Sequence, residues 1–273
     1  SLIINIFSEI NSKTLSYIIT FLIVIIAQLN FGEGDYPVHY LSEHTYGLYG
    51  IAISTLLFGL IANGNFKFAF FLSTFFVSIH GFHGIWFCGI LILTILIDRF
   101  IKKDFYKSKE IIIGSLLGTL VFIISFFYNY NFIGATEYFT VVESDLEIVK
   151  DWIKYWEYHR TIEEFHFIFL LKSFFFLLFL LISLKFTKKY LNRNTKYLII
   201  LISVSILFSS IIYLLYKIFF NFLPTFIMVP MPTRFLNVHS IIAWPVITGL
   251  TIIYIKLFSE KYKINLYKSY FGF

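Results

Sequence analysis

The sequence predicts an all-α integral membrane protein, and three observations lead to this fold class. Of the 273 residues, 58% are apolar and only 14% are charged, whereas a soluble domain carries about 25% charged residues. The mean hydropathy is +0.80. The apolar residues also form long runs, and a helix needs about 20 of them to cross a bilayer. These features exclude a water-soluble globule and a disordered chain.

Eight apolar runs predict a bundle of about eight transmembrane helices in a single polytopic domain, residues 1–273. In chain order the predicted spans are 14–31, 47–63, 66–80, 84–98, 111–133, 165–184, 197–220 and 235–257. Glycine-containing turns at 63–65 and 80–84 separate the two short spans from their neighbours. A bilayer can accommodate short spans by thinning locally.

Lysine and arginine residues in the short loops predict the orientation. They are concentrated at 99–109, at 185–196 and in the tail after 256, and loops rich in these residues stay on the cytoplasmic side. With eight spans, both termini are then cytoplasmic, and a bacterial inner membrane is the expected location. We expect this side to be a plain basic surface that sets the topology and contacts anionic membrane lipids. The net charge of +6 therefore does not indicate nucleic acid as a partner.

Eleven of the 16 acidic residues and all seven histidines are expected at or near the opposite, outer side. Three outer segments matter most: 32–46, 134–164 and 221–234. In the long outer loop, Ser144 and Glu147 form a capping box ahead of an apolar periodicity. This pattern predicts an amphipathic helix at 144–158 on the outer membrane surface. The helix either covers the bundle or borders an entrance for a lipid substrate.

Two outer carboxylates are candidate catalytic residues. Glu33 and Asp35 flank a glycine in the first outer loop. Such a pair can bind a divalent cation through oxygen ligands, or one of them can act as a general base on an acceptor hydroxyl. In the alternative interpretation, these two residues are only solvated acids of a loop. The sequence therefore leaves open whether a divalent cation is the cofactor.

Outer basic residues are candidates for binding a substrate phosphate. Arg160 and Arg234 carry the planar donor fork that suits phosphate, and His159 precedes the first of them. Lys172 lies deep in the sixth span, where a lysine normally faces the bundle interior or a watery cavity. Anchoring of helices at the membrane interface is the alternative role for the two arginines.

A further polar site is predicted at two span ends. His80 and His83 are three residues apart around a glycine-rich turn, and Asn237 and His239 lie at the start of the last span. Several histidines together can ligate a transition metal. Histidines also cap helices and bind lipid headgroups, so the sequence leaves open whether a metal is bound. The chain has no H-E-x-x-H, G-x-S-x-G, P-loop or dinucleotide motif, and a nucleotide-driven machine is not indicated.

The outer motifs resemble those of bacterial multi-spanning membrane glycosyltransferases of the GT-C type and their uncharacterised relatives. The resemblance rests on E-G-D at 33–35, on T-Y-G-L-Y-G at 45–50, on I-H-G-F-H-G at 79–84, on W-E-Y-H-R at 156–160 and on P-T-R-F at 232–235. It implies transfer of a sugar from a polyprenyl-phosphate-type donor at the non-cytoplasmic face of the cell envelope. Asp35 or Glu33 would be the base or metal ligand, and Arg160 and Arg234 would contact the lipid phosphate. An acidic loop upstream of Ser1 in a longer parent protein would take over the acidic role.

Two other functions remain open at this stage. A transporter or flippase for a polar or lipid-linked solute predicts a cavity that reaches the midplane at Lys172. A non-catalytic membrane subunit of a larger complex predicts a wide apolar flank. The enzyme predicts a groove that is open to lipid and to the outer space.

Overall fold

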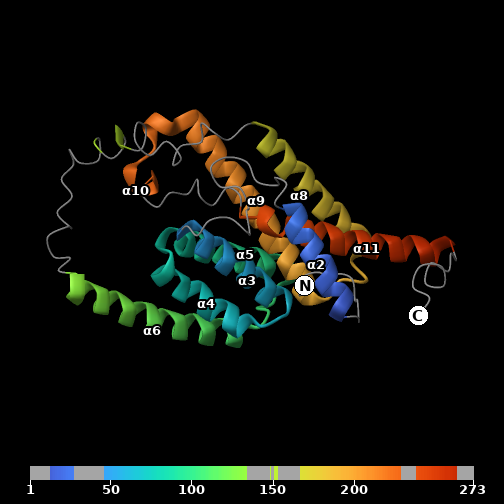
Figure 1. Ribbon diagram of the computed structural model, residues 1–273, viewed down its shortest axis with the longest axis horizontal. Helices are drawn as coiled ribbons and strands as arrows, with labels where there is room; N and C mark the ends of the chain where they lie inside the picture. The colour runs from blue at the N-terminus through green and yellow to red at the C-terminus, as the bar shows by residue number, and fades with distance from the viewer. Residues whose placement is uncertain are drawn as a thin grey trace.

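The computed structural model describes residues 13–27, 46–133, 148, 151–152, 167–228 and 238–262, and all regular secondary structure within these residues is helical (Figure 1). Eight long helices dominate it. They are α2 (Lys13–Ala27), α3 (Tyr46–Ala62), α4 (Phe66–Ile79), α5 (Gly81–Lys102), α6 (Ser108–Ile133), α8 (Phe167–Thr187), α9 (Arg193–Phe219) and α11 (Ala243–Tyr262). Shorter pieces are η3 (Phe220–Phe222), α10 (Thr225–Met228) and η5 (Ser240–Ile242).

Each of the eight predicted spans overlaps one of these long helices, in the predicted order. Five helical stretches are apolar and long enough to cross a membrane: Gly81–Lys102, Ser108–Tyr128, Leu170–Thr187, Arg193–Phe222 and Ser240–Ser259. Two apolar helical stretches are shorter, Tyr49–Ala62 and Phe66–Ile79. The described chain is therefore all-helical, with five helices of membrane length.

Several helix ends differ from the predicted limits. Helix α9 begins four residues before the predicted 197, because the Asn192 side chain accepts the N–H of Thr195 at 2.8 Å and so caps the helix. Helix α5 runs to Lys102, beyond the predicted end at 98. The last predicted span, 235–257, begins as η5 and then α11, and Pro245 lies in the first turn of α11, where a missing N–H is tolerated.

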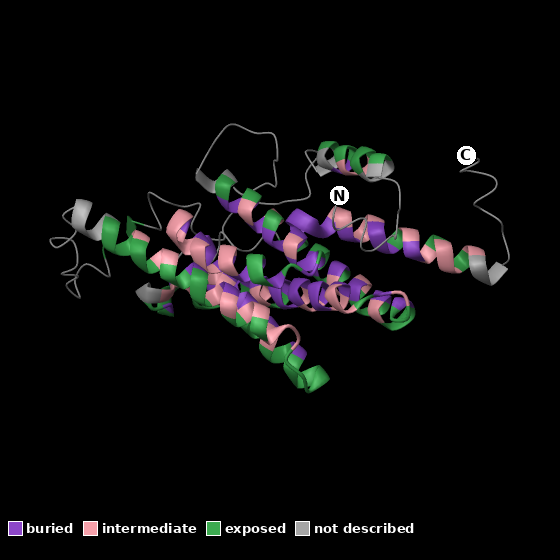
Figure 2. Cartoon of the chain, turned by 90° about the horizontal axis from the view of Figure 1, so that it is seen from below, coloured by how far each residue is buried: buried purple, intermediate pink, exposed green. Residues whose placement is uncertain are grey.

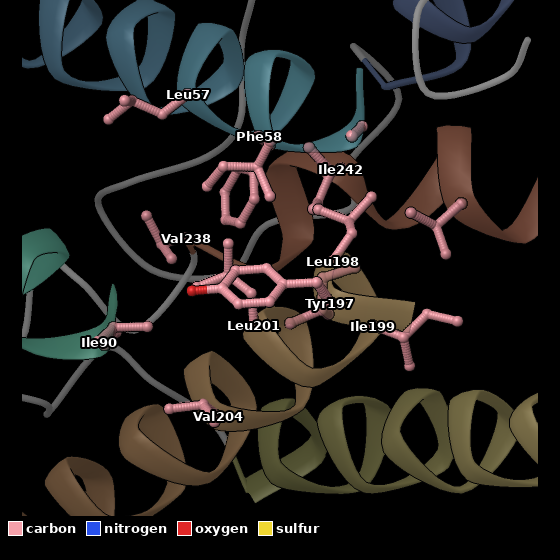
Figure 3. Close-up of a cluster of buried hydrophobic side chains, with 14 of the residues drawn as sticks. Leu57, Phe58, Ile90, Tyr197, Leu198, Ile199, Leu201, Val204, Val238 and Ile242 are labelled. Atoms are coloured by element: carbon pink, nitrogen blue, oxygen red, sulfur yellow. The ribbon is translucent and has the colours of Figure 1, made fainter. Parts of the chain in front are cut away.

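Helix α9 forms the centre of the bundle. In Figure 3, Tyr197, Leu201 and Val204 lie among apolar side chains from other helices. These partners include Leu57 and Phe58 of α3, Ile90 of α5, and Val238 and Ile242 at the start of the last helical segment. Buried residues accordingly concentrate along the middle of the bundle, whereas exposed ones border it (Figure 2). The chain leading into α11 is thus anchored in the core.

Helices α4 and α6 pack unusually closely. A Cβ added at Gly118 would collide with the Phe71 carbonyl oxygen and the Thr74 hydroxyl, and one at Gly114 with the Lys67 carbonyl oxygen. Two glycines four residues apart let helix backbones approach in this way. The opposite side of α6 exposes a row of large apolar side chains, including Ile112, Leu116, Leu120 and Ile124.

Three connections meet at one end of the bundle. Lys107 Nζ donates to the Gly64 carbonyl oxygen at 2.7 Å, which joins the α5–α6 connection to the α3–α4 turn. Tyr106 Oη donates to Asn194 Oδ1 at 2.6 Å, which joins it to the start of α9. The basic loops predicted to share one side of the membrane therefore lie at the same end of the helices.

The predicted outer helix at 144–158 falls almost wholly outside the described residues. Within it, Ile148, Asp151 and Trp152 are helical and exposed.

Candidate functional site

His80 and His83 form a buried imidazole pair where α4 turns into α5. Their side chains are 1% and 3% exposed, and their ring centroids are 4.4 Å apart in an edge-to-face arrangement. The His83 backbone N–H donates to His80 Nδ1 at 3.4 Å, so His80 acts as the N-cap of α5. The spacing of three residues thus corresponds to an N-cap residue and the third residue of the helix that it caps.

Helix α3 closes over this histidine pair with a glycine. A Cβ at Gly50 would lie 3.3 Å from Cδ2 of both His80 and His83, which is closer than ordinary van der Waals contact. Phe76 of α4 packs on both imidazole rings from another side, with centroids 6.3 and 6.4 Å away. The pair is therefore a packed interior feature at the junction of three helices.

A second buried polar pair joins α8 to the segment before α11. Ser173 Oγ and His239 Nε2 are 3.0 Å apart in a hydrogen bond whose direction depends on the histidine tautomer. Both residues are buried, at 2% and 3% exposed. Ser173 lies about 20 Å along α8 from Thr187, at 1.5 Å per residue. This hydrogen bond fixes the entry into the last helical segment well inside the bundle.

The three described histidines correct one expectation. His80, His83 and His239 were predicted beside an aqueous outer boundary, but the structure buries all three rings among apolar side chains. The sequence pattern located them at helix ends but did not show that Gly50 and Ser173 would pack against them. They are better suited to joining helices than to direct contact with water.

Lys172 also departs from its predicted setting. Its position in α8 indicated a side chain that faces the bundle interior or a cavity, yet the side chain is exposed, and the inward-facing residue is its neighbour Ser173. A helix rotates by about 100° per residue, so adjacent residues cannot share a face. The apolar run predicted the helix but not which side of it faces the bundle.

The remaining candidate residues lie outside the described part of the chain. They are the proposed catalytic Glu33 and Asp35, the proposed phosphate ligands His159, Arg160 and Arg234, and Asn237. In the residues that the structure does describe, histidine, cysteine and acidic side chains form no group of three or more that could hold a metal ion.

The opposite end of the bundle carries an ordered polar cluster that the sequence did not reveal. Arg193 at the start of α9 donates to Asp98 Oδ2 at 2.6 Å and to Asp104 Oδ1 at 3.1 Å. Its guanidinium group also lies 4.9 Å from the centroid of the Tyr106 ring. We call Asp98, Asp104, Tyr106, Arg193 and Asn194 the ionic cluster.

The ionic cluster corrects the expectation of a plain basic surface on this side. The Asp98 side chain is only 5% exposed and that of Arg193 25% exposed, whereas that of Asp104 is 61% exposed. The ion pair between Asp98 and Arg193 is therefore largely shielded from water. The one available signal was Asp98, a lone acid at the end of an apolar run, but nothing in the sequence identified a partner 95 residues away.

Comparisons with protein-family models, with curated proteins and with solved structures gave no significant match for this chain.

Proposed function

We propose that the chain is a polytopic membrane protein with eight spans and both termini in the cytoplasm of a bacterium. Five apolar helices of membrane length support this topology. The contacts of Lys107 with Gly64 and of Tyr106 with Asn194 support it as well, because they hold the basic connections at one end. Positively charged loops of this kind stay on the cytoplasmic side.

The observation that carries the functional proposal is the direction of the helices. Because the α3–α4, α5–α6 and α8–α9 connections meet at the ionic cluster, α3 begins, α6 ends, α8 begins and α9 ends away from it. Segments 28–45, 134–166 and 229–237 precede or follow these helix ends in the chain. These segments contain the two candidate carboxylates and the two candidate arginines. An outward-facing enzyme that acts on a lipid-linked substrate requires the candidate carboxylates and arginines to lie at the same end of the bundle.

We propose that the protein transfers a sugar from a polyprenyl-phosphate donor at this outer end. Asp35 or Glu33 takes the proton from the acceptor hydroxyl, the acceptor oxygen bonds to the anomeric carbon of the sugar, and the bond from that carbon to the phosphate breaks. The polyprenyl phosphate leaves with the electron pair, held by Arg160 and Arg234 with His159. Lys172, exposed in the first turns of α8 near the same end, extends this basic surface.

A non-catalytic membrane subunit is the second candidate, and one observation favours it. The side of α6 that faces away from α4 exposes large apolar side chains along its described length, and such a flank suits another membrane protein as well as lipid. The transporter alternative has less support, because Lys172 is exposed on the surface of α8 and does not face the bundle interior.

Single substitutions with matched controls test the enzyme. In the purified protein, with a polyprenyl-phosphate sugar and candidate acceptors, we expect Asp35→Asn or Glu33→Gln to lower transfer by about a hundredfold or more. Arg160→Gln and Arg234→Gln should weaken binding of polyprenyl phosphate. Asp145→Asn and Lys150→Gln, in the same outer loop as Arg160, serve as the controls.

Two measurements distinguish a loss of donor binding from a loss of sugar transfer. Binding of polyprenyl phosphate is measured by its effect on thermal unfolding, and sugar transfer is followed by the surface glycans of the host. The enzyme is contradicted if all four substituted proteins fold, bind polyprenyl phosphate like the controls and leave the surface glycans unchanged.

A further inference from the structure

Two hydrogen bonds join α8 to the last helical segment, which consists of η5 and α11, at different levels of the bundle. Ser173 Oγ and His239 Nε2 are 3.0 Å apart near the start of α8, and Tyr254 Oη donates to Ser183 Oγ at 3.2 Å. Ten residues of a helix separate Ser173 from Ser183, which is about 15 Å. The first bond therefore lies toward the proposed outer end, and the second lies toward the end with the basic connections.

The residues around His239 are anchored in the core. Val238, His239 and Ser240 are each 5% exposed or less, and Val238 lies among apolar side chains of α3, α5 and α9 (Figure 3). Arg234 precedes His239 by five residues. An extended chain covers about 3.5 Å per residue, so the Cα atoms of these two residues are at most about 18 Å apart. The anchoring of His239 therefore limits where the Arg234 guanidinium group can lie.

The same hydrogen bond acts on the turn of α8 that carries Lys172. Lys172 directly precedes Ser173, and its side chain is exposed, whereas that of Ser173 is buried against the bundle. The bond between Ser173 and His239 is thus a direct link between the turn with Lys172 and the segment that follows Arg234. Without this link, the turn and the segment would be freer to shift relative to each other.

We propose that Ser173 is a positioning residue for the binding of the donor phosphate. Its hydrogen bond with His239 fixes the outer part of α8 against the start of the last helical segment, and so limits the spacing between Lys172 and Arg234. Basic groups from two segments bind one phosphate tightly only when the protein holds them at the right spacing. The inference rests on the proposed function, because it concerns the same phosphate-binding surface.

Binding of polyprenyl phosphate to the purified full chain tests this role. Native mass spectrometry gives the dissociation constant, and thermal unfolding is recorded separately. We expect Ser173→Ala to weaken binding about tenfold, which is the order of effect when a binding group loses a supporting hydrogen bond. Ser173→Thr keeps the hydroxyl group and should restore most of the binding.

Ser183→Ala is the matched control. It removes a buried hydroxyl group from the second hydrogen bond between the same two segments, so it should also lower the unfolding temperature. Because Ser183 lies far from the outer end, we expect its substitution to change the binding of polyprenyl phosphate by less than about twofold.

A second pair of variants tests the same bond if Ser173→Ala does not fold. The side chain introduced by His239→Gln places an amide group near the position of Nε2, whereas the shorter one introduced by His239→Asn ends before it reaches Ser173. We expect His239→Gln to bind polyprenyl phosphate about tenfold more tightly than His239→Asn.

The outcomes separate this inference from the proposed function. If the wild-type protein does not bind polyprenyl phosphate, both are wrong. If it binds, and Arg234→Gln weakens binding while Ser173→Ala and Ser183→Ala have equal effects, the proposed function stands and the positioning role is overturned. Equal binding by His239→Gln and His239→Asn overturns the positioning role as well.

Discussion

Arg193 forms both ion pairs of the ionic cluster. It binds a carboxylate at the end of α5 and another in the α5–α6 connection, and it lies over the Tyr106 ring. Arginine suits this position because its planar fork donates in several directions at once and stacks on aromatic rings. A lysine at 193 would keep the charge but would offer no planar group to stack on the Tyr106 ring.

The two carboxylates should contribute unequally to stability. Asp98→Asn leaves a largely shielded guanidinium group without its closest charged partner, and we expect it to lower the free energy of unfolding by about 2 kcal/mol. Asp104→Asn, at an exposed carboxylate, should cost less than about 0.5 kcal/mol. Thermal unfolding of both variants in detergent measures the difference. Equal effects would contradict the assigned role of the shielded pair.

The hydrogen bond between Ser173 and His239 should also be measurable. Ser173→Ala removes the hydroxyl group from His239 Nε2 inside the bundle, and we expect a loss of about 1 kcal/mol or more in the free energy of unfolding. Ser210→Ala is the matched control, because its hydroxyl group donates only to the Ile206 carbonyl oxygen of its own helix and its loss should have little effect. If both variants unfold alike, His239 is not held by Ser173.

At the scale of the element, the contact between α4 and α6 depends on glycine. Helix α6 is exposed along most of its described length and meets the bundle through α4 (Figure 2). Because Gly114 and Gly118 have no side chain, carbonyl groups of α4 lie directly against the α6 backbone. Close packing of this kind is the main source of helix association in lipid, where apolar burial gives no advantage.

A single methyl group should disturb this contact. Gly118→Ala places a Cβ against the Phe71 carbonyl oxygen and the Thr74 hydroxyl, and overpacking of this type costs about 1–3 kcal/mol. Gly89→Ala in α5 is the control, since its Cβ would meet nothing within 4 Å and alanine favours the helix. Thermal unfolding should show destabilisation for the first variant and none for the second. The opposite order would contradict the close approach of α4 and α6.

The helices themselves were predictable, because the length of an apolar run is a local property of the sequence. The ends of the helices were less predictable. Helix α9 starts early because the Asn192 side chain caps it. Helix α5 ends at Lys102, because the next residue, Lys103, adopts a left-handed conformation at φ 57° without being a glycine. The histidine pair was visible from its spacing. The partners of His239 and Asp98 were not, because they come from helices far away in the sequence.

At the scale of the whole molecule, the proposed chemistry depends on which residues lie at which end of the helix bundle. The basic connections meet through the ionic cluster and its neighbours, and the three segments with the candidate carboxylates and arginines leave from the other helix ends. Hydropathy and the distribution of lysine predicted this division, since both reflect the energy of moving charge across a bilayer. The arrangement of the candidate site within its own end depends on residues beyond those described.

The most direct test of the account is the accessibility of single cysteines from each side of the membrane. In a Cys88→Ser background, which removes the one native cysteine, single cysteines are introduced by Lys103→Cys, Lys189→Cys, Glu143→Cys and Val229→Cys and treated with a membrane-impermeant maleimide. The account predicts that positions 103 and 189 react only from the cytoplasmic side, and positions 143 and 229 only from the outer side. Reaction of positions 103 and 143 from the same side would contradict it.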